Sequence, residues 1–371
     1  MLVLALLALA AWLYLATLHG RFWQSGPTLP EAQDATASIA VIVPARNEAE
    51  SIAHSLGSLL AQQYSGALSI ILVDDNSTDG TAAIAAALPH AERLTIISGQ
   101  PLPAGWSGKL WAVHQGLQHP LAQAAEFVLL TDADILHAPT HLATLVHRAQ
   151  THGDDLVSEM VRLHCDSAAE RAYIPAFIFF FQMLYPFAQV NDARSRTAGA
   201  AGGTMLIRRS ALDRIDGVER IRQNLIDDCA LARELKQSGA RLWLGHAELA
   251  DSLRIYADRR EIWNMIARTA YVQLNHWLPT LAGCIAGMTL LYLAPPALTL
   301  FAHGLTRLIA LITWLLMAAL FQPTLRRYRR SPLWGLALPG IASFYLAATI
   351  ASAYRHHAGR GGGWKDRTYP A

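Results

Sequence analysis

The sequence has few cysteines and little net charge. Its three cysteines lie far apart and form no CxxC pair, which excludes the disulfide framework of a small secreted domain and the usual ligand spacing of a zinc site. This usage fits a reducing compartment. The formal net charge of the 371 residues is only +2, so charge gives no sign of a nucleic-acid partner, and none is expected. Internal repeats and low-complexity tracts are absent from the sequence.

Charged residues are scarce as well, at 16% of the chain, while hydrophobic residues make up 53%. The mean hydropathy is positive, at +0.23. An ordinary soluble protein is less apolar than this. The chain is long enough for one large domain together with membrane segments, and its composition predicts that combination.

The first apolar run is residues 1–18, which carry no charge. At about 1.5 Å per residue, a helix of this length crosses most of a hydrocarbon core that is about 30 Å thick. A cleaved signal peptide is the alternative, but such peptides begin with a basic region that this sequence lacks, and Arg21 lies on the wrong side of the run. We therefore expect a retained transmembrane helix over residues 1–20.

The other apolar segments lie near the C-terminus and predict a transmembrane helical region over residues 277–355. Three runs make it up: 278–302, 308–321 and 332–354. The basic stretch at 326–330 should face the cytoplasm by the positive-inside rule. Three full crossings would place the basic, glycine-rich tail (356–371) outside, although the same rule prefers it inside. A re-entrant last segment, bent near Pro339, would reconcile the two.

Residues 38–275 have the pattern of a soluble α/β domain. Short β-branched and aliphatic runs such as "IAVIV", "LSIILV" and "EFVLL" alternate with helical patterns. This alternation predicts right-handed β-α-β units and a Rossmann-like, mostly parallel sheet. In such sheets, ligands bind beyond the carboxyl ends of the strands.

Polar clusters follow three of these predicted strands. Arg46 and Glu48 follow the first strand, Asp75 follows the second, and Asp132 and Asp134 follow the fourth, which we expect to run through "EFVLLTDADI". Each cluster alone could be a solvated turn or a helix cap. Because the three would meet at the same edge of one sheet, a shared ligand site is the better interpretation.

The Asp-Ala-Asp sequence at 132–134 predicts a divalent cation. Two carboxylates one residue apart repel each other unless a cation lies between them and a ligand. Magnesium-like ions bind one or two protein carboxylates and complete their shell with water and substrate phosphates. A diphosphate-bearing substrate would therefore explain the pair, with the metal neutralising the leaving group.

Four segments together resemble the family-2 glycosyltransferases of the GT-A fold: "VIVPARNEAESI", "ILVDDNSTDGT", "GKLWAVHQG" and "LLTDADI". The resemblance covers about residues 38–275. It implies that Asp132 and Asp134 bind a divalent metal, Mg²⁺ or Mn²⁺, together with the diphosphate of a nucleotide sugar, and that Asp75 holds the uracil of a UDP-sugar. The further residues that it places at the nucleotide sugar are Pro44, Ala45, Arg46, Glu48 and Lys109.

The resemblance also implies a catalytic base at a helix N-terminus. The acidic pair in "NLIDDCALARE" matches that motif, with Asp227 where relatives carry Glu. Asp228 is the candidate base, which takes the acceptor's proton in a single, inverting displacement. Helix capping is the alternative, because the helix dipole favours acids at this end. Gly202 and Gly203 precede a predicted strand and, by the resemblance, line the acceptor side, with a tight turn as the alternative.

Residues 172–190 carry no charge and are long enough to cross a membrane. A single crossing here would separate Asp228 from Asp132. We therefore expect an aromatic-rich helix that lies in the membrane interface, broken near Pro175 and Pro186. A buried core helix is the alternative. The interfacial interpretation indicates a lipid acceptor.

The chain looks most like the hopanoid-biosynthesis-associated glycosyltransferases, which implies a hopanoid or a similar polycyclic or isoprenoid alcohol as acceptor. We expect a multi-pass protein of the inner (cytoplasmic) membrane of a bacterium, with its catalytic domain in the cytoplasm. A processive polysaccharide synthase is a second interpretation, but Arg268 and Trp277 do not have the spacing of that group's Gln/Arg-x-x-Arg-Trp motif. A catalytically inactive membrane scaffold is a third.

Overall fold

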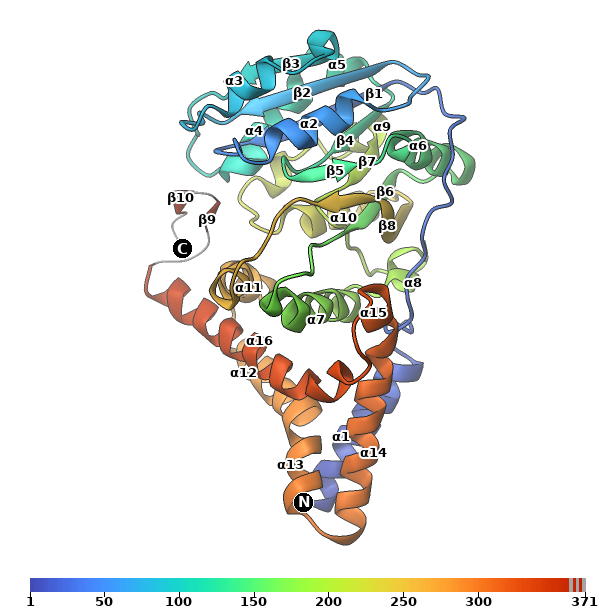
Figure 1. Ribbon diagram of the computed structural model, residues 1–371, viewed down its shortest axis with the longest axis vertical. Coiled ribbons are helices and arrows are strands. Elements are labelled where there is room, and N and C mark those ends of the chain that lie inside the picture. The colour runs from blue at the N-terminus through green and yellow to red at the C-terminus, as the bar shows by residue number, and fades with distance from the viewer. Residues whose placement is uncertain (360–362, 365–366, 369–371) are drawn as a thin grey trace.

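The computed structural model describes residues 1–359, 363–364 and 367–368. An α/β domain forms one end of the molecule and a group of helices forms the other (Figure 1). The first helix of the chain packs on C-terminal helices in the helical end. Half of the basic tail expected over residues 356–371 falls outside the described residues.

The α/β domain is built on an eight-stranded mixed sheet with the order β3-β2-β1-β4-β7-β6-β8-β5. The strands are β1 (Ile39–Ala45), β2 (Leu68–Asp74), β3 (Leu94–Ser98), β4 (Phe127–Leu130), β5 (Ile135–His137), β6 (Leu156–Arg162), β7 (Met205–Arg208) and β8 (Leu242–Ser252). β1 pairs in parallel with β2 and β4, as the alternating pattern predicts. β7 runs antiparallel between β4 and β6, and β5 runs antiparallel beside β8, so the sheet is less uniform than expected.

Helices cover both faces of this sheet. Alternate residues of β1 point to opposite faces, and both sets are buried, so each face needs a covering layer. Ile42 packs with Leu110 on one face, whereas Val41 packs with Leu56 on the other. The helices of the domain are α2 (Ile52–Leu60), α3 (Thr81–Ala86), α4 (Gly108–Gln118), α5 (Pro120–Ala124), α6 (His141–His152), α9 (Arg209–Asp213) and α10 (Asp227–Gln237), with short 3₁₀ turns at Ala91–Arg93 and Glu219–Ile221. Two buried layers thus hold the carboxyl edge of the sheet in place.

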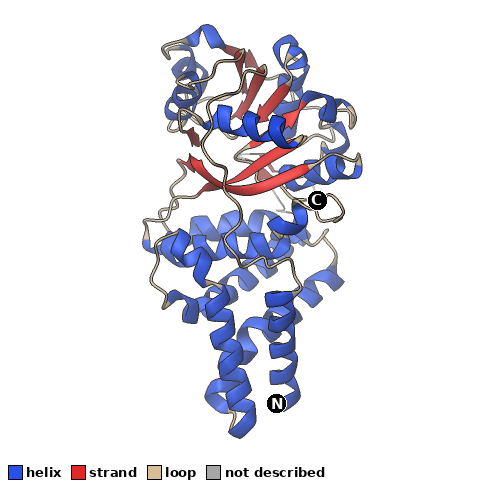
Figure 2. Ribbon diagram, turned by 90° about the vertical axis from the view of Figure 1, so that its right-hand side faces the viewer, coloured by secondary structure: helices blue, strands red, loops and turns tan. Residues whose placement is uncertain are grey.

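The helical end consists of a lengthwise bundle and a crosswise layer (Figures 1 and 2). Its elements are α1 (Leu2–Thr17), α7 (Ala168–Leu184), α8 (Phe187–Val190), α11 (Arg259–Gln273), α12 (Leu278–Met288), a π-helical turn (Thr289–Leu293), α13 (Ala294–Phe301), α14 (Gly304–Leu320), α15 (Gln322–Arg327) and α16 (Trp334–His357). α1, α13 and α14 run along the long axis, and α7 lies across it beneath the sheet. By length and composition, four helical stretches of the described chain could cross a membrane: Ala168–Val190, Leu278–Phe301, Gly304–Arg327 and Trp334–His357.

The N-terminal helix is shorter than the span expected over residues 1–20. α1 has 16 residues, so it is about 24 Å long at 1.5 Å per residue. It packs on the C-terminal helices. The indole Nε1 of the buried Trp12 donates to the carbonyl of Leu291 at 2.9 Å, and its ring meets that of Tyr292 edge to face. The two apolar ends of the sequence therefore form one helical unit.

α7 is the aromatic-rich segment, and about half of it is buried against the rest of the protein. The expected break near Pro186 is confirmed, but the break near Pro175 is wrong, because this proline lies within an uninterrupted helix. Phe179 is buried, and the ring of Phe180 packs on those of Tyr292 and Tyr345. These rings were expected to enter a membrane, yet they contact the chain's own helices. The core-helix alternative describes α7 better than the interfacial one.

α16 is one continuous helix that contains Pro339, so the chain does not turn back there. It lies obliquely across the end of the bundle (Figure 1). The Tyr345 hydroxyl donates to the carbonyl of Tyr173 in α7 at 2.9 Å. Near its C-terminal end, Arg355 donates to the side-chain oxygen of Asn264 in α11 at 3.0 Å. α16 therefore runs along the helices next to the α/β domain.

Candidate functional site

The loops after β1 and β2 hold each other in place, as their joint position at the sheet edge predicts. Asn47 has a positive φ of 53°, and its side-chain oxygen accepts a hydrogen bond from the Thr78 amide at 2.9 Å. The Arg46 guanidinium donates to the backbone carbonyl of Asp75 at 2.6 Å. The side chain of Asp75 is buried, at 1% exposure. These bonds place both loops beside the carboxyl end of β4.

The Asp-Ala-Asp sequence forms a turn, so the strand expected through "EFVLLTDADI" is in fact two strands. The backbone turns at Ala133 and Asp134 between β4 and β5. Burial, and then the neighbouring Asp132, raises the pKa of Asp134 to about 6. A divalent cation would remove this cost by pairing with both carboxylates.

Within the described residues, no group of three or more His, Cys, Asp or Glu side chains is arranged to hold a metal by itself. The Asp132–Asp134 pair fits an ion of the magnesium type, which takes few protein ligands and fills its shell with phosphate oxygens and water. The burial of Asp134 beside the charge of Asp132, which raises the pKa of Asp134, favours a cation at this pair.

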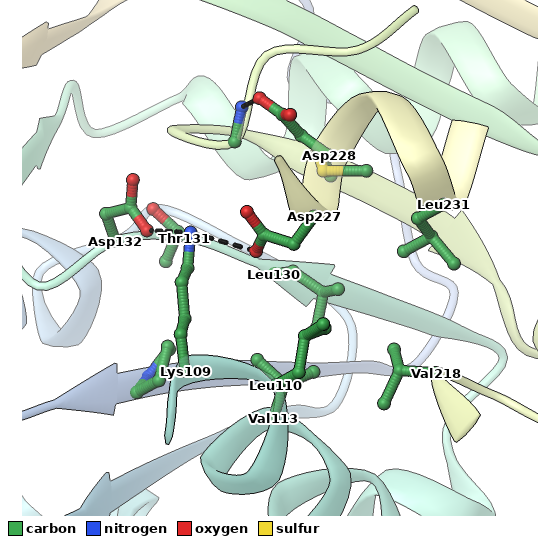
Figure 3. Close-up of a pocket in the computed structure, with 13 residues that line it drawn as sticks. Lys109, Leu110, Val113, Leu130, Thr131, Asp132, Val218, Asp227, Asp228 and Leu231 are labelled. Atoms are coloured by element: carbon green, nitrogen blue, oxygen red, sulfur yellow. Dashed lines mark hydrogen bonds and ion pairs between the residues drawn. The ribbon is translucent and has the colours of Figure 1, made fainter. Parts of the chain in front are cut away.

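Lys109 joins the two acidic motifs (Figure 3). Its ammonium Nζ lies 2.8 Å from Oδ1 of Asp132 and 3.1 Å from Oδ2 of Asp227. Burial works against the charge of Lys109, but the two carboxylates outweigh it and raise the pKa of the ammonium. One lysine at the start of α4 thus links residues that are about a hundred positions apart in the sequence.

Asp228 is held at the N-terminal turn of α10 by two backbone amides. Its Oδ2 accepts from the Gly202 amide at 2.9 Å, and its Oδ1 accepts from the Cys229 amide at 2.7 Å. Burial, and then the nearby Asp227, raises the pKa of Asp228 to about 6. A Cβ at position 202 would lie 3.3 Å from Oδ2 of Asp228, so glycine permits this close approach.

These groups meet in one open cleft of about 1080 Å³ at the carboxyl edge of the sheet. The predicted residues that line it are Pro44, Glu48, Lys109, Asp132, Asp134 and Asp227. Asp228 and Gly202 line a small adjoining cavity together with Lys109 and Asp132. Four predicted residues lie behind these walls rather than on them: Ala45, Arg46, Asp75 and Gly203.

The cleft also holds two arginines that the sequence patterns did not assign. Arg254 follows β8, and Arg268 lies on α11. The positive charge of Arg254 acts on Asp134 and lowers its pKa against the larger effect of burial. Arg268 carried no predicted role because its spacing to Trp277 is irregular. The sequence signal for Arg254 was its place directly after an apolar strand, as for the other site residues.

A buried hydrogen-bonded chain supports the cleft from behind. The Thr131 hydroxyl donates to the Gly203 carbonyl at 2.8 Å, so it accepts from Nε2 of His137 at 3.2 Å. Nδ1 of His137 then accepts from Nδ1 of His141 at 2.8 Å, and Nε2 of His141 lies 2.8 Å from Oε2 of Glu159. We call Thr131, His137, His141 and Glu159 the His137 chain. Each polar side chain in it has a hydrogen-bond partner when one proton lies between His141 and Glu159.

The comparisons with known proteins concern the family and the fold. Residues 40–216 match the family model "Glycosyl transferase family 2". The 4,4'-diaponeurosporenoate glycosyltransferases from two strains of Staphylococcus aureus are 33% and 32% identical to the chain over 119 residues, which is 32% of this chain. The chain covers only 29% of the length of these relatives.

A solved structure is similar over almost the whole chain. It is the mannosyltransferase from Pyrobaculum calidifontis in complex with GDP-Man and Mn²⁺, with a TM-score of 0.56 and 20% identity. The alignment covers 96% of this chain and 98% of that one. At this identity the likeness shows the fold, which is the expected GT-A type.

Proposed function

We propose that this chain is a membrane-bound, inverting glycosyltransferase that moves a sugar from a nucleotide sugar, a UDP-sugar, to the hydroxyl of a lipid. The observation that carries the proposal is the meeting of Asp132, Asp227 and Lys109 in one cleft, with Asp228 beside it. Scattered surface acids of an inactive scaffold have no reason to converge on one partly buried lysine.

The donor end of the cleft suits a diphosphate. Lys109, Arg254 and Arg268 offer three cationic side chains along its walls. Asp132 and Asp134 would hold Mg²⁺ or Mn²⁺, and the complex of the Pyrobaculum calidifontis mannosyltransferase with Mn²⁺ supports this assignment. The metal would supply charge to the leaving diphosphate. Asp75, buried beneath the same edge, stays the predicted partner of the nucleotide base.

Asp228 is the proposed base. Its two hydrogen bonds to backbone amides fix the carboxylate at the α10 terminus, and a pKa of about 6 leaves it ionised at neutral pH yet able to take a proton. It accepts the proton of the acceptor hydroxyl as that oxygen bonds to the anomeric carbon. The bond from this carbon to the diphosphate breaks on the opposite face, so the anomeric centre inverts.

The helical end supports a membrane location with the catalytic domain in the cytoplasm. We infer that α1, α12 with α13, and α14 cross the bilayer, whereas α7 and α16 lie between the bundle and the domain. Arg327 pairs with Glu248 of β8 at 2.8 Å, so the basic stretch at 326–330 lies on the side of the catalytic domain. With α16 not crossing, the C-terminal end of this helix at His357 stays on that same side, as the positive-inside rule prefers for the basic residues there.

The acceptor class rests on the relatives and on the helices. The Staphylococcus aureus proteins are named for 4,4'-diaponeurosporenoate, which supports a lipid-like acceptor. A hopanoid alcohol remains our prediction from the resemblance of the sequence. Mass spectrometry of membrane lipids from bacterial cells with and without the chain should reveal a lipid heavier by one hexose or N-acetylhexosamine. Unchanged lipids, together with no calorimetric binding of UDP-sugars in the presence of Mn²⁺, would contradict the proposal.

A further inference from the structure

A second cavity, of about 630 Å³, lies next to the donor cleft. Ligand pockets in proteins commonly measure about 300–1,000 Å³. Ser107, Asn224 and Leu225 line both spaces, so two short segments form the wall between them. The other side of the cavity comes from α11, from the segment that follows it, and from α16. The cavity therefore lies between the catalytic site and the helical end.

The charge of this cavity is opposite to that of the donor cleft. Its lining contains no Asp or Glu, and its ionisable side chains with basic character are Arg233, His276 and His356. The exposed Arg233 lies one turn after Cys229 on α10. The rings of His276 and His356 stack with their centroids 4.1 Å apart. The donor cleft, by contrast, is lined by Asp132, Asp134, Asp227 and several Glu side chains.

The remaining lining is amphipathic. Trp106, Leu225, Ile226 and Val272 offer apolar surface. The Tyr185 hydroxyl and the side-chain amide of Gln273 bond to each other at the boundary between α7 and α11. A ligand with an apolar body and an anionic end matches this combination, because a guanidinium pairs well with a carboxylate.

We propose that the second cavity binds the acidic end of the acceptor lipid, with Arg233 as its main partner, while the acceptor hydroxyl reaches Asp228 past Ser107 and Asn224. This assignment rests on the proposed function and narrows its substrate class to lipids that carry a carboxylate. A neutral alcohol lacks the group that Arg233 pairs with, so it should bind more weakly. The inference therefore favours an acidic lipid over the neutral hopanoid alcohol that the sequence resemblance predicts.

The test is quenching of Trp106 fluorescence in the detergent-solubilised full chain. The probes are 9,10-dibromostearate and 9,10-dibromostearyl alcohol. Subtracting the quenching measured in the Trp106→Phe variant leaves the contribution of Trp106, and so reports binding in the cavity. We expect Arg233→Gln to weaken stearate binding roughly tenfold and to leave alcohol binding unchanged. Arg233→Lys should recover part of the loss. Arg241→Gln, an exposed arginine outside the cavity, is the matched control and should bind like the unsubstituted chain.

Equal binding of acid and alcohol, or unchanged stearate binding in Arg233→Gln, would overturn the proposal. A competition experiment gives a further check, in which unlabelled stearate and phosphatidylglycerol each displace the brominated stearate. If phosphatidylglycerol displaces the probe at the same concentration as stearate does, the proposal is overturned, because the cavity would then bind the headgroup of a bulk phospholipid. Calorimetric titration of the same preparations with UDP-glucose and Mn²⁺ tests the proposed function separately. The Arg233→Gln variant should bind UDP-glucose as the unsubstituted chain does. If the unsubstituted chain binds no nucleotide sugar, the proposed enzyme function is contradicted. The quenching experiment would still show whether the second cavity binds an acidic lipid.

Discussion

Two regions of the α/β domain hold carboxylates in opposite ways. In the cleft, Asp134 and Asp228 lie beside other acids, and the pKa of each is raised to about 6. Behind the cleft, the buried Glu159 faces His141 at 2.8 Å, and the His137 chain satisfies every group between it and Gly203. The cleft compensates the charge of its carboxylates only in part, whereas the buried region compensates it fully.

The difference separates function from stability. Carboxylates crowded together cost folding free energy unless a ligand neutralises them, and active sites often carry this cost. A buried carboxylate with a complete set of partners costs little until one partner is removed. Changes in the cleft should therefore abolish activity without lowering stability. Changes in the His137 chain should lower stability without abolishing activity.

The largest effect on activity is expected from Asp228→Asn. General bases contribute about 10²–10⁴-fold to turnover, so we expect kcat to fall roughly a thousandfold. The amide keeps the shape of the side chain and removes a charge that burial disfavours, but its NH₂ group replaces one oxygen that accepts from a backbone amide. These two effects oppose each other, so the melting temperature should change little. Nucleotide-sugar binding by calorimetry should match that of the unsubstituted chain. Normal turnover in this variant would contradict the assignment of the base.

Removal of divalent metal should have the next largest effect. Excess EDTA should abolish transfer, and Mn²⁺ or Mg²⁺ should restore it. Asp134→Asn should need much higher metal for half-maximal activity, since Asp134 is a proposed ligand. Metal binding below pH 6 should also release protons in the unsubstituted chain, because the pKa of Asp134 is raised to about 6 and the carboxyl is mostly protonated there. Transfer at full rate in EDTA would rule out the metal.

The His137 chain should show its effect in stability. Glu159→Ala leaves His141 buried without its partner, and breaking a buried ion pair in this way costs about 3–5 kcal/mol. We expect a marked drop in the free energy of unfolding, measured by denaturant titration. The exposed Glu92→Gln is the control and should leave it unchanged. Unchanged stability in Glu159→Ala would show that the buried region is not the more finely compensated one.

Local patterns were enough to predict the edge of the sheet. β1, β2 and β4 are short apolar runs that end in polar residues, so both the strands and the joint position of their loops follow from periodicity and chirality. The assignment of Lys109, Asp227 and Asp228 to the site came from the family resemblance. Local periodicity does not indicate that a lysine on α4 will contact an acid on α10. The antiparallel β7 between β4 and β6 had no distinct local signal either.

The helical end was harder to predict for a physical reason. An uncharged run of aromatic and aliphatic residues suits a membrane, an interface and a protein core equally well, so the composition of α7 could not decide among them. Its surroundings come from Tyr292 and Tyr345, more than a hundred positions away. The second cavity is assembled from equally distant segments, at Trp106, Tyr185, Arg233 and Gln273. Such sites depend on tertiary contacts that a single sequence does not display.

The smallest predicted effect is a shift in pH dependence, and it tests the crowding in the cleft directly. The base must be ionised, and the pKa of Asp228 is raised to about 6, so kcat should fall about tenfold per pH unit below pH 6 and level off above it. Asp227 is one cause of this raised pKa, after burial. Asp227→Asn removes a nearby negative charge, so it should move the acidic limb of the profile to lower pH. Because Asp227 also pairs with Lys109, kcat on the plateau should be compared separately from the position of the limb. If the acidic limb stays in place, the charge of Asp227 does not raise the pKa of the base. The difference between the carboxylates of the cleft and the buried Glu159 would then come from burial alone.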